Sequence, residues 1–532
     1  MLGWALSLCS HGLAQGGGPD EEAIDKIWQE ANRKYDGARA GLVATVDRQA
    51  ASGPFRPDWT SLTGYRVPEW YENAKFGIFI HWGLYSVPAF ANEWYSRNMY
   101  QPDSREFKHH VDTYGPHTKF GYKDFIPLFK AEHFEPRAWA RLFREAGARY
   151  VVPVAEHHDG FPMYDSNLTD WCAGKMGPKR DLLGELAGAI RQEGLHFGTS
   201  THRAEHDWFF DGGRRFASDV SDPKFAAFYG PAHPRFVREG FDHNLIEDWT
   251  YVSPAYLDDW LARTAEIVEK YQPELIYFDW WIGQPSFRGH VTRFAAYYYN
   301  KSAQGGRKGA VLNYKDHAFR ENTATFDVER GQLTDIRPQH WQTDTSISNA
   351  SWGYLPNDTY KSPELLVHQL ADIVSKNGNL LLNVTPRPDG TIPEGEQATL
   401  REVGAWLKTN GEAIYDTRPW TRFGEGPTQV AGGAFQDANP KPFTPLDFRF
   451  TVKGTTIYAI ELGWPADGRA TIRSLGSDVL AQGKSRDKIR EVSLLGSPAK
   501  LKWQQRADRL EVELPAQRPG KYAYTLRVTV RP

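Results

Sequence analysis

Short apolar segments alternate with amphipathic helical segments along most of the chain, from about Val67 to Trp420. The apolar segments are rich in β-branched and aromatic residues, whereas the helical ones repeat apolar residues every three or four positions. Such alternation is typical of a parallel sheet whose faces are covered by helices. The sequence predicts strands at 76–80, 150–154, 196–200, 275–278 and 380–384, and helices at 136–146, 181–193, 253–270, 363–375 and 394–409.

Polar and aromatic residues follow directly after several of these strands. A barrel of parallel strands gathers its functional groups in this way, at the C-terminal ends of the strands. Together with the length of the alternating region, this predicts an α/β fold with a (β/α)8-like, TIM-type catalytic barrel. A helical extension at residues 21–45 precedes the barrel, and the two together are predicted to occupy residues 21–420.

The sequence pattern changes after about Trp420. Residues 422–446 are rich in Gly, Pro and polar residues and predict a linker or long loop. Short alternating apolar runs follow, which predict a C-terminal antiparallel β-sandwich. The predicted strands are 447–452, 456–462, 470–474, 490–494, 510–514 and 522–530, and linker and sandwich together take up residues 421–532.

Residues 1–20 resemble a secretory signal segment. An apolar run extends from Leu2 to Leu8, and Gly12 and Ala14 place small residues where cleavage after Ala14 would need them. The usual positive charge before the apolar run is missing, so a disordered N-terminus is the alternative interpretation. We expect a secreted or periplasmic protein.

Charge and composition exclude several classes of protein. The formal net charge is −3 without a basic stripe, so we expect no nucleic-acid partner. No apolar run reaches the length of a transmembrane segment. Cys9 and Cys172 are the two cysteines, too few for a disulfide framework or a Cys-based zinc site. Aromatic residues make up 14% of the chain, which suits either sugar stacking or a large core.

Two carboxylates stand out near predicted strand ends. Asp279 follows an apolar strand and precedes two tryptophans, and a carboxylate there is costly unless it is paired or used. Its alternative role is to cap the following loop. Glu329 lies beside Arg330, where a surface ion pair is the alternative. Glycoside hydrolysis needs two carboxyl groups, one as nucleophile or base and one as acid.

His157 and His158 follow another strand and precede Asp159. Adjacent histidines point in different directions on a strand, so a metal site that also used Asp159 and His81 would need a bent backbone. We favour hydrogen bonds from the imidazoles to sugar hydroxyls, and we predict no metal and no cofactor. A structural role for the histidines stays open, as do core packing or sugar stacking for Trp82, Trp94 and Trp352.

Several motifs occur in these regions. They read AKFGIFIHWG at 74–83, EWY at 93–95, HHDGF at 157–161, RDLLGEL at 180–186, SWGY at 351–354 and NGEAIYDTRPW at 410–420. Together they resemble glycoside hydrolase family 29, the α-L-fucosidases, from about Pro68 to Trp420. The resemblance implies an exo-acting, retaining α-L-fucosidase whose substrate is a fucosylated oligosaccharide or glycoconjugate.

Matching the motifs position by position implies roles for particular residues. Asp279 corresponds to the family nucleophile, and Glu329 is our choice for the acid/base. The positions that bind the fucose hydroxyls or face its C5 methyl group correspond to His81, Glu93, Trp94, His157, His158 and Trp352. The implied reaction is a two-step displacement through a covalent fucosyl-enzyme, without a metal or cofactor.

Two positions depart from the family pattern. Many relatives carry Tyr after the strand at 196–200, whereas residues 199–206 here read TSTHRAEH. We therefore expect His202 or His206 to supply contacts that Tyr makes elsewhere. A position that is Arg in some relatives corresponds to Lys315. Both departures concern substrate preference rather than the class of reaction.

Other functions stay open at this level. The chain could be a catalytically silent carbohydrate-binding protein on the same fold, or a metal-dependent hydrolase that uses the histidine pair. It could also hydrolyse a related sugar such as an α-L-galactoside, because a hydrophobic pocket rejects one added hydroxyl only weakly. The sequence does not decide whether the protein forms a homo-oligomer or whether the sandwich binds carbohydrate.

Overall fold

The computed structural model describes residues 19–236, 250–305, 309–437, 440–482 and 488–530. Residues 1–18 of the predicted signal segment, with Cys9, lie outside these ranges, and Pro19 begins the first helix, α1 (Pro19–Asn32). None of the helices in the described ranges is long and apolar enough to cross a membrane.

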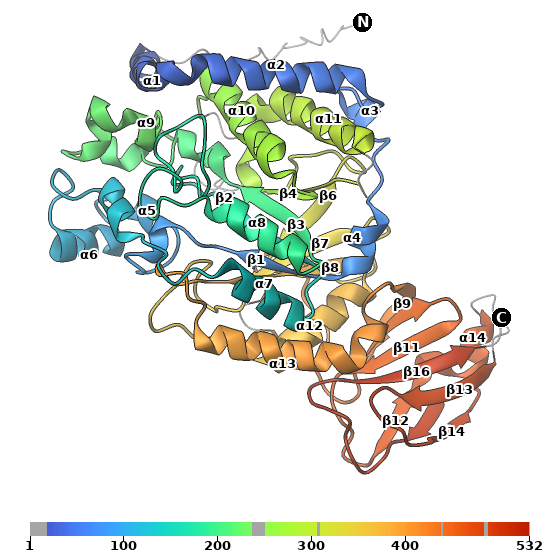
Figure 1. Ribbon diagram of the computed structural model, residues 1–532. Coiled ribbons are helices and arrows are strands. Elements are labelled where there is room, and N and C mark those ends of the chain that lie inside the picture. The colour runs from blue at the N-terminus through green and yellow to red at the C-terminus, as the bar shows by residue number, and fades with distance from the viewer. Residues whose placement is uncertain (1–18, 237–249, 306–308, 438–439, 483–487, 531–532) are drawn as a thin grey trace, which may run out of the picture.

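Eight parallel strands of the described chain close into a barrel in which each strand pairs with its neighbour in sequence. The last strand pairs with the first, with Phe76 opposite Leu380, and completes the ring. This confirms the predicted (β/α)8 class (Figure 1). The strands are β1 (Phe76–Ile80), β2 (Tyr150–Glu156), β3 (His196–Thr201), β4 (Leu275–Phe278), β5 (Val311–Tyr314), β6 (Thr325–Glu329), β7 (Trp341–Ser346) and β8 (Gly378–Val384).

Helices surround the barrel, and their ends follow from local sequence. The helix predicted at 253–270 is α10 (Pro254–Tyr271), where the Ser253 hydroxyl accepts the Tyr256 N–H and proline occupies the first helical position. The other helices of four residues or more are α2 (Asp36–Ser52), α3 (Trp59–Leu62), α4 (Glu69–Ala74), α5 (Tyr95–Asn98), α6 (Arg105–Tyr114), α7 (Pro136–Glu145), α8 (Leu182–Gln192), α9 (Ala226–Tyr229), α11 (Arg288–Gln304), α12 (Pro363–Ser375), α13 (Glu394–Asn410) and α14 (Ser477–Gln482).

The N-terminal helix α2 lies across α10 and α11 on the outside of the barrel, and α1 lies beside α9 (Figure 1). The Arg39 guanidinium of α2 contacts the buried Asp259 carboxylate of α10 at 2.9 Å. The side-chain amide of Asn300 on α11 donates to the carbonyl oxygen of Gln49 at 3.0 Å. The predicted helical extension is thus attached to the barrel rather than separate from it.

Three barrel strands, β5 to β7, were absent from the predicted strands because they are short or polar. The segment of β7 reads Trp-Gln-Thr-Asp-Thr-Ser and lacks an apolar alternation, yet every residue in it is buried. Polar partners inside the barrel account for this. The Gln342 amide oxygen accepts hydrogen bonds from the hydroxyls of Tyr71 and Tyr150 at 2.6 and 2.9 Å. Its nitrogen donates to Asp327 at 2.7 Å.

The C-terminal region forms the predicted antiparallel sandwich. One sheet has the order β13-β16-β11-β10-β9 and the other β12-β15-β14. The expectation of a linker from residue 422 is wrong at its start, because β9 extends to Glu425 and pairs with β10 at the edge of the larger sheet. The strands are β9 (Arg418–Glu425), β10 (Phe448–Lys453), β11 (Thr456–Glu461), β12 (Arg469–Ile472), β13 (Ile489–Leu494), β14 (Lys502–Gln505), β15 (Leu510–Glu513) and β16 (Tyr524–Val530).

The sandwich packs against α12 of the barrel, and the Trp406 N–H of α13 donates to the Ala523 carbonyl oxygen at 2.8 Å (Figure 1). Apolar side chains of the sandwich, including Tyr458 and Ile460, belong to the same buried cluster as the barrel helices. At the junction, the fully buried Asp372 carboxylate of α12 contacts Arg449 Nε of β10 at 2.5 Å and Lys376 Nζ at 2.7 Å. One buried anion therefore balances two buried cations between the two regions.

We expect Asp372→Asn to lower the free energy of unfolding by about 3–5 kcal/mol, because it leaves two buried cations without their counter-ion. The matched control is Asp47→Asn, which removes a half-exposed partner of Arg293 and should cost no more than about 1 kcal/mol. Urea unfolding of both variants measures the difference. Equal midpoints for the two variants would contradict a stabilising role for this junction.

Candidate active site

Polar side chains from six consecutive strands meet at the C-terminal end of the barrel, where TIM-type enzymes place their functional groups. Each of them comes from the last residue of a strand or from the first residues after it. They are His81 after β1, His157 and His158 after β2, His202 after β3, Asp279 after β4, Lys315 after β5 and Glu329 at the end of β6.

Asp279 both caps the following turn and joins this cluster. Its Oδ1 accepts the backbone N–H of Trp280 and contacts Lys315 Nζ, each at 2.9 Å. Its Oδ2 lies 3.0 Å from Nδ1 of His202 and 3.5 Å from Nε2 of His158. The capping contact considered from sequence is therefore present, and the same carboxylate also contacts Lys315, His202 and His158.

Electrostatics keep Asp279 ionised. Burial alone would raise the pKa of its carboxyl group, but the ammonium of Lys315 and the imidazole of His202 hold that pKa well below its ordinary range. The pKa of Lys315 shifts the other way, to a higher value. Burial would lower the pKa of its ammonium, but the nearby carboxylates of Asp279 and Glu329 raise it well above the usual value.

Glu329 differs from Asp279 in its protonation. Burial raises the pKa of Glu329 to about 7, although Lys315 acts against this shift. Its Oε2 lies 2.6 Å from Lys315 Nζ. The carboxylate oxygens of Asp279 and Glu329 that share this ammonium are therefore at most about 5.5 Å apart, by the sum of the two contacts. The neighbouring Arg330 instead contacts Asp437 at 3.5 Å.

Three of the predicted sugar-binding histidines are buried in the cluster. His81 is fixed by Asn383, whose amide oxygen lies 2.8 Å from Nδ1 of the ring. His158 has Nδ1 at 3.2 Å from the Glu205 carboxylate. Burial lowers the pKa of His81 and His157 well below the ordinary range, and that of His158 to about 3. All three imidazoles are therefore neutral at neutral pH.

The remaining predicted residues line the same cluster. The Glu93 carboxylate accepts the backbone N–H of Trp352 at 2.9 Å and the hydroxyl of Ser351 at 3.1 Å, which fixes the loop that carries Trp352. The Trp352 ring lies 5.1 Å from that of His81, between centroids. The Trp94 ring lies 5.3 Å from that of His158. The structure thus brings all eight predicted site residues to one place.

Asp159 does not join the cluster, contrary to the metal site considered from sequence. Its carboxylate accepts the hydroxyl of Tyr122 at 2.7 Å and the backbone N–H of Phe161 at 3.1 Å. The turn after the histidine pair also needs Gly160. That residue has φ of +74°, and a Cβ there would lie 2.3 Å from the His206 ring. His206 itself bonds the His158 carbonyl oxygen at 3.0 Å, behind the cluster.

Two sets of residues among those described could hold a metal ion. One is His81, His157 and His202, and the other is His158, His202 and Asp279. Both sets include His202, the residue that stands where many relatives are expected to carry Tyr. Neutral imidazoles and a carboxylate are suitable ligands for zinc and related ions.

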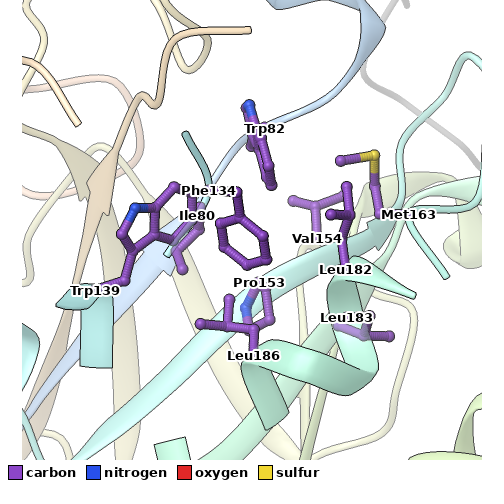
Figure 2. A pocket seen from close by; sticks show the side chains of 10 residues that line it. All are labelled: Ile80, Trp82, Phe134, Trp139, Pro153, Val154, Met163, Leu182, Leu183 and Leu186. Carbon is purple, nitrogen blue, oxygen red and sulfur yellow. The ribbon is translucent and has the colours of Figure 1, made fainter. Parts of the chain in front are cut away.

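Trp82 lies in the core rather than in the cluster. Figure 2 shows it beside Phe134 around a small apolar cavity, together with Trp139 and residues of β1, β2 and α8. The rings of Trp82 and Phe134 are 5.0 Å apart, between centroids. The Trp82 N–H donates to the carbonyl oxygen of Arg387 at 2.8 Å. Its core interpretation is therefore confirmed.

Sequence reasoning missed two residues that organise the cluster. Asn383 orients His81 and also donates to the carbonyl oxygen of Trp352 at 2.9 Å. The signal for it was available, because an amide near the end of the apolar strand β8 is unusual. The contact of Glu205 with His158 was also missed. No local pattern marks it, because this contact depends on how the turn after β3 folds.

Comparison with known proteins agrees with this geometry. A family model described as alpha-L-fucosidase matches residues 42–412, and one described as the C-terminal domain of alpha-L-fucosidase matches residues 442–529. The chain is 33% identical to the plasma α-L-fucosidase of Pongo abelii, covering 89% of this chain and 93% of that protein. It is 30% identical to the tissue α-L-fucosidase of Rattus norvegicus, covering 92% and 96%.

Solved structures show the same relationship. The α-fucosidase of Thermotoga maritima in complex with fucose is 32% identical, with a TM-score of 0.69, and the match covers 89% of this chain and all of that one. A complex of that enzyme with a mechanism-based inhibitor gives a TM-score of 0.70 at 31% identity. On fold, sequence and the arrangement of its strand ends, this chain belongs to the α-L-fucosidases of glycoside hydrolase family 29.

Proposed function

We propose that this protein is an exo-acting, retaining α-L-fucosidase that releases terminal α-L-fucosyl residues from glycans or glycoconjugates. This mechanism is supported by one observation above all, which is that the carboxyl groups of Asp279 and Glu329 both contact the ammonium of Lys315. One carboxyl group is held ionised and the other has a pKa of about 7. Their two oxygens on Lys315 are at most about 5.5 Å apart, closer than the roughly 6.5–9.5 Å between the carboxyl groups of inverting enzymes, which supports retention.

The proposed reaction has two steps. The Asp279 carboxylate attacks C1 of the sugar, the C1–O bond breaks, and Glu329 gives its proton to the departing oxygen. This leaves a covalent β-linked fucosyl-enzyme and ionised Glu329. Glu329 then takes a proton from water, whose oxygen attacks C1, so that α-L-fucose leaves and Asp279 is ionised again.

The substrate roles of the remaining residues follow from their positions. We assign the fucose hydroxyls to His81, Glu93, Trp94, His157 and His158, and the C5 methyl group to Trp352. Neutral imidazoles support this assignment, because each offers one donor and one acceptor to neighbouring hydroxyls. Glu93 is partly committed to the Trp352 loop, so its removal would disturb two contacts at once.

The signal-like N-terminus supports export, and we propose a secreted or periplasmic enzyme that acts on fucosylated oligosaccharides or glycoconjugates. An α-L-galactoside is the second candidate substrate, since it adds only a hydroxyl to the methyl group near Trp352.

The function is tested by incubating the protein with p-nitrophenyl α-L-fucoside and following the first products by proton NMR. We expect α-L-fucose to appear before mutarotation. Early β-L-fucose would overturn the role of Asp279 as nucleophile. If no sugar is released but L-fucose binds in a titration, the protein is a carbohydrate-binding protein instead.

We expect Lys315→Met to move the whole pH profile of kcat/KM to higher pH. Lys315 lowers the pKa of both carboxyl groups, so its removal raises both. The acidic limb, where Asp279 must ionise, and the alkaline limb, where Glu329 must stay protonated, then both move upward. The limbs are measured from initial rates across the pH range.

The matched control is Lys361→Met. Lys361 is a buried lysine that contacts Asp437 at 3.2 Å and the Ser346 carbonyl oxygen at 2.8 Å, so its loss should leave both limbs in place. If both limbs of the pH profile stay in place in Lys315→Met, the Lys315 ammonium does not set the protonation of Asp279 and Glu329.

A further inference from the structure

Three imidazoles meet where β1, β2 and β3 end. One ring nitrogen from each of His81, His157 and His202 lies within 4.8 Å of the other two. The ring centroids are 5.6, 5.5 and 4.8 Å apart. A tetrahedral ion with Zn–N bonds of about 2.0–2.1 Å places the centroids of its imidazole ligands about 5 Å apart. Small side-chain rotations would therefore bring the three nitrogens to ligand distance.

Two of the three rings already have the proton placement of a metal ligand. The Asn383 amide oxygen accepts the backbone N–H of His81 at 3.0 Å and faces Nδ1 of that ring at 2.8 Å. Because an amide oxygen only accepts, Nδ1 carries the proton and Nε2 keeps its lone pair. In zinc sites, ligating histidines are held in this way by an oxygen acceptor on the far side of the ring.

His202 is held similarly. Its Nδ1 lies 3.0 Å from Asp279, an ionised acceptor, so its Nε2 also keeps a lone pair. That nitrogen accepts the Ser200 hydroxyl at 3.1 Å, a neutral donor that an ion can displace. The third ring, His157, has a buried Nδ1 without a hydrogen-bond partner among the described residues.

We propose that His81, His157 and His202 bind a divalent ion of the zinc class, which occupies part of the sugar site and inhibits the enzyme reversibly. Three imidazoles suit Zn²⁺, Co²⁺, Ni²⁺ and Cu²⁺ rather than Mg²⁺ or Ca²⁺. Asp279 adds negative charge behind His202, and a water molecule completes the tetrahedron. Binding of the ion rests on these residues alone, whereas the inhibition rests on the proposed function.

Direct binding is measured by titrating Co²⁺ into the full chain and following the visible absorption of tetrahedral cobalt, with Zn²⁺ as competitor. We expect one saturable site, displaced by Zn²⁺, with binding at least about tenfold weaker in His202→Ala. The matched control is His196→Ala, which removes an imidazole paired with Glu274 outside the cluster and should leave binding unchanged. Saturable binding that survives His202→Ala, or none in the unaltered chain, overturns the site.

Activity supplies the second readout. We expect Zn²⁺ to raise KM for p-nitrophenyl α-L-fucoside without lowering kcat, and EDTA to reverse the effect. If the unaltered chain lacks activity but binds Co²⁺, the proposed function fails and the metal site stands. If the chain is active and Zn²⁺ lowers kcat with KM unchanged, the ion does not compete with the sugar and the inhibitory role is overturned.

Discussion

Replacing Asp279 with asparagine should lower kcat on p-nitrophenyl α-L-fucoside by about 10⁴-fold or more, because the asparagine amide cannot replace the carboxylate as the nucleophile. The fold should survive the change, because the Asn side-chain oxygen can still accept the Trp280 N–H that Asp279 accepts at 2.9 Å. Lys315 also keeps its contact with Glu329 at 2.6 Å. Initial rates and thermal unfolding of the same preparation measure both effects.

A stereochemical control sharpens this prediction. In Asp279→Gly, added azide can take the place of the missing carboxylate and attack C1 of an activated aryl fucoside from the same side. A single displacement inverts the centre, so the product should be β-L-fucosyl azide. Turnover near the level of the unaltered protein in Asp279→Asn, or an α-azide from Asp279→Gly, would assign the nucleophile elsewhere.

Replacing Glu329 with alanine should slow hydrolysis by about 10²–10³-fold, and the loss should be smaller for aryl fucosides with good leaving groups. Such substrates need no acid in the first step, so the fucosyl-enzyme still forms and its hydrolysis becomes slow. Azide needs no base and should restore turnover. Because it attacks the β-linked intermediate, its product should be α-L-fucosyl azide, identified by NMR.

Glu93→Ala and Glu205→Ala are the comparison variants for this experiment, since both carboxyl groups are buried near the cluster. Azide should leave their rates unchanged. If instead azide accelerates one of them and not Glu329→Ala, that residue is the acid/base. The alkaline limb of kcat/KM should also disappear in Glu329→Ala on a good leaving group, since the group with a pKa of about 7 is gone.

Much of the barrel could be predicted from local pattern, and the exceptions have a physical cause. Strands such as β1 and β4 are continuous apolar runs buried on both faces, which the sequence displays directly. β7 is just as buried, but its inward side chains are polar and are satisfied by partners from other elements, such as Tyr71 of α4 and Tyr150 of β2. Such pairing across the barrel leaves no periodic signal.

The candidate site divides in a similar way. Asp279 and the histidine pair were found because each follows a recognisable strand, and family resemblance supplied Glu93 and Trp352. What the sequence could not supply is which groups touch. A surface ion pair with Arg330 was the alternative considered for Glu329, yet its partner is Lys315, directly after the preceding strand β5. A partner that is fixed by the closure of the barrel cannot be predicted from neighbours in the sequence.

The position of Lys315 has a consequence for the whole proposed cycle. Before reaction, Asp279 carries the negative charge and Glu329 carries a proton. Once the sugar is attached, Asp279 is an uncharged ester and Glu329 is ionised. Of this pair, which lies 2.9 and 2.6 Å from the ammonium, one group is an anion at every stage. The negative charge passes from one side of a stationary cation to the other, so the enclosed site stays at constant net charge and needs no ion from solvent as the reaction proceeds.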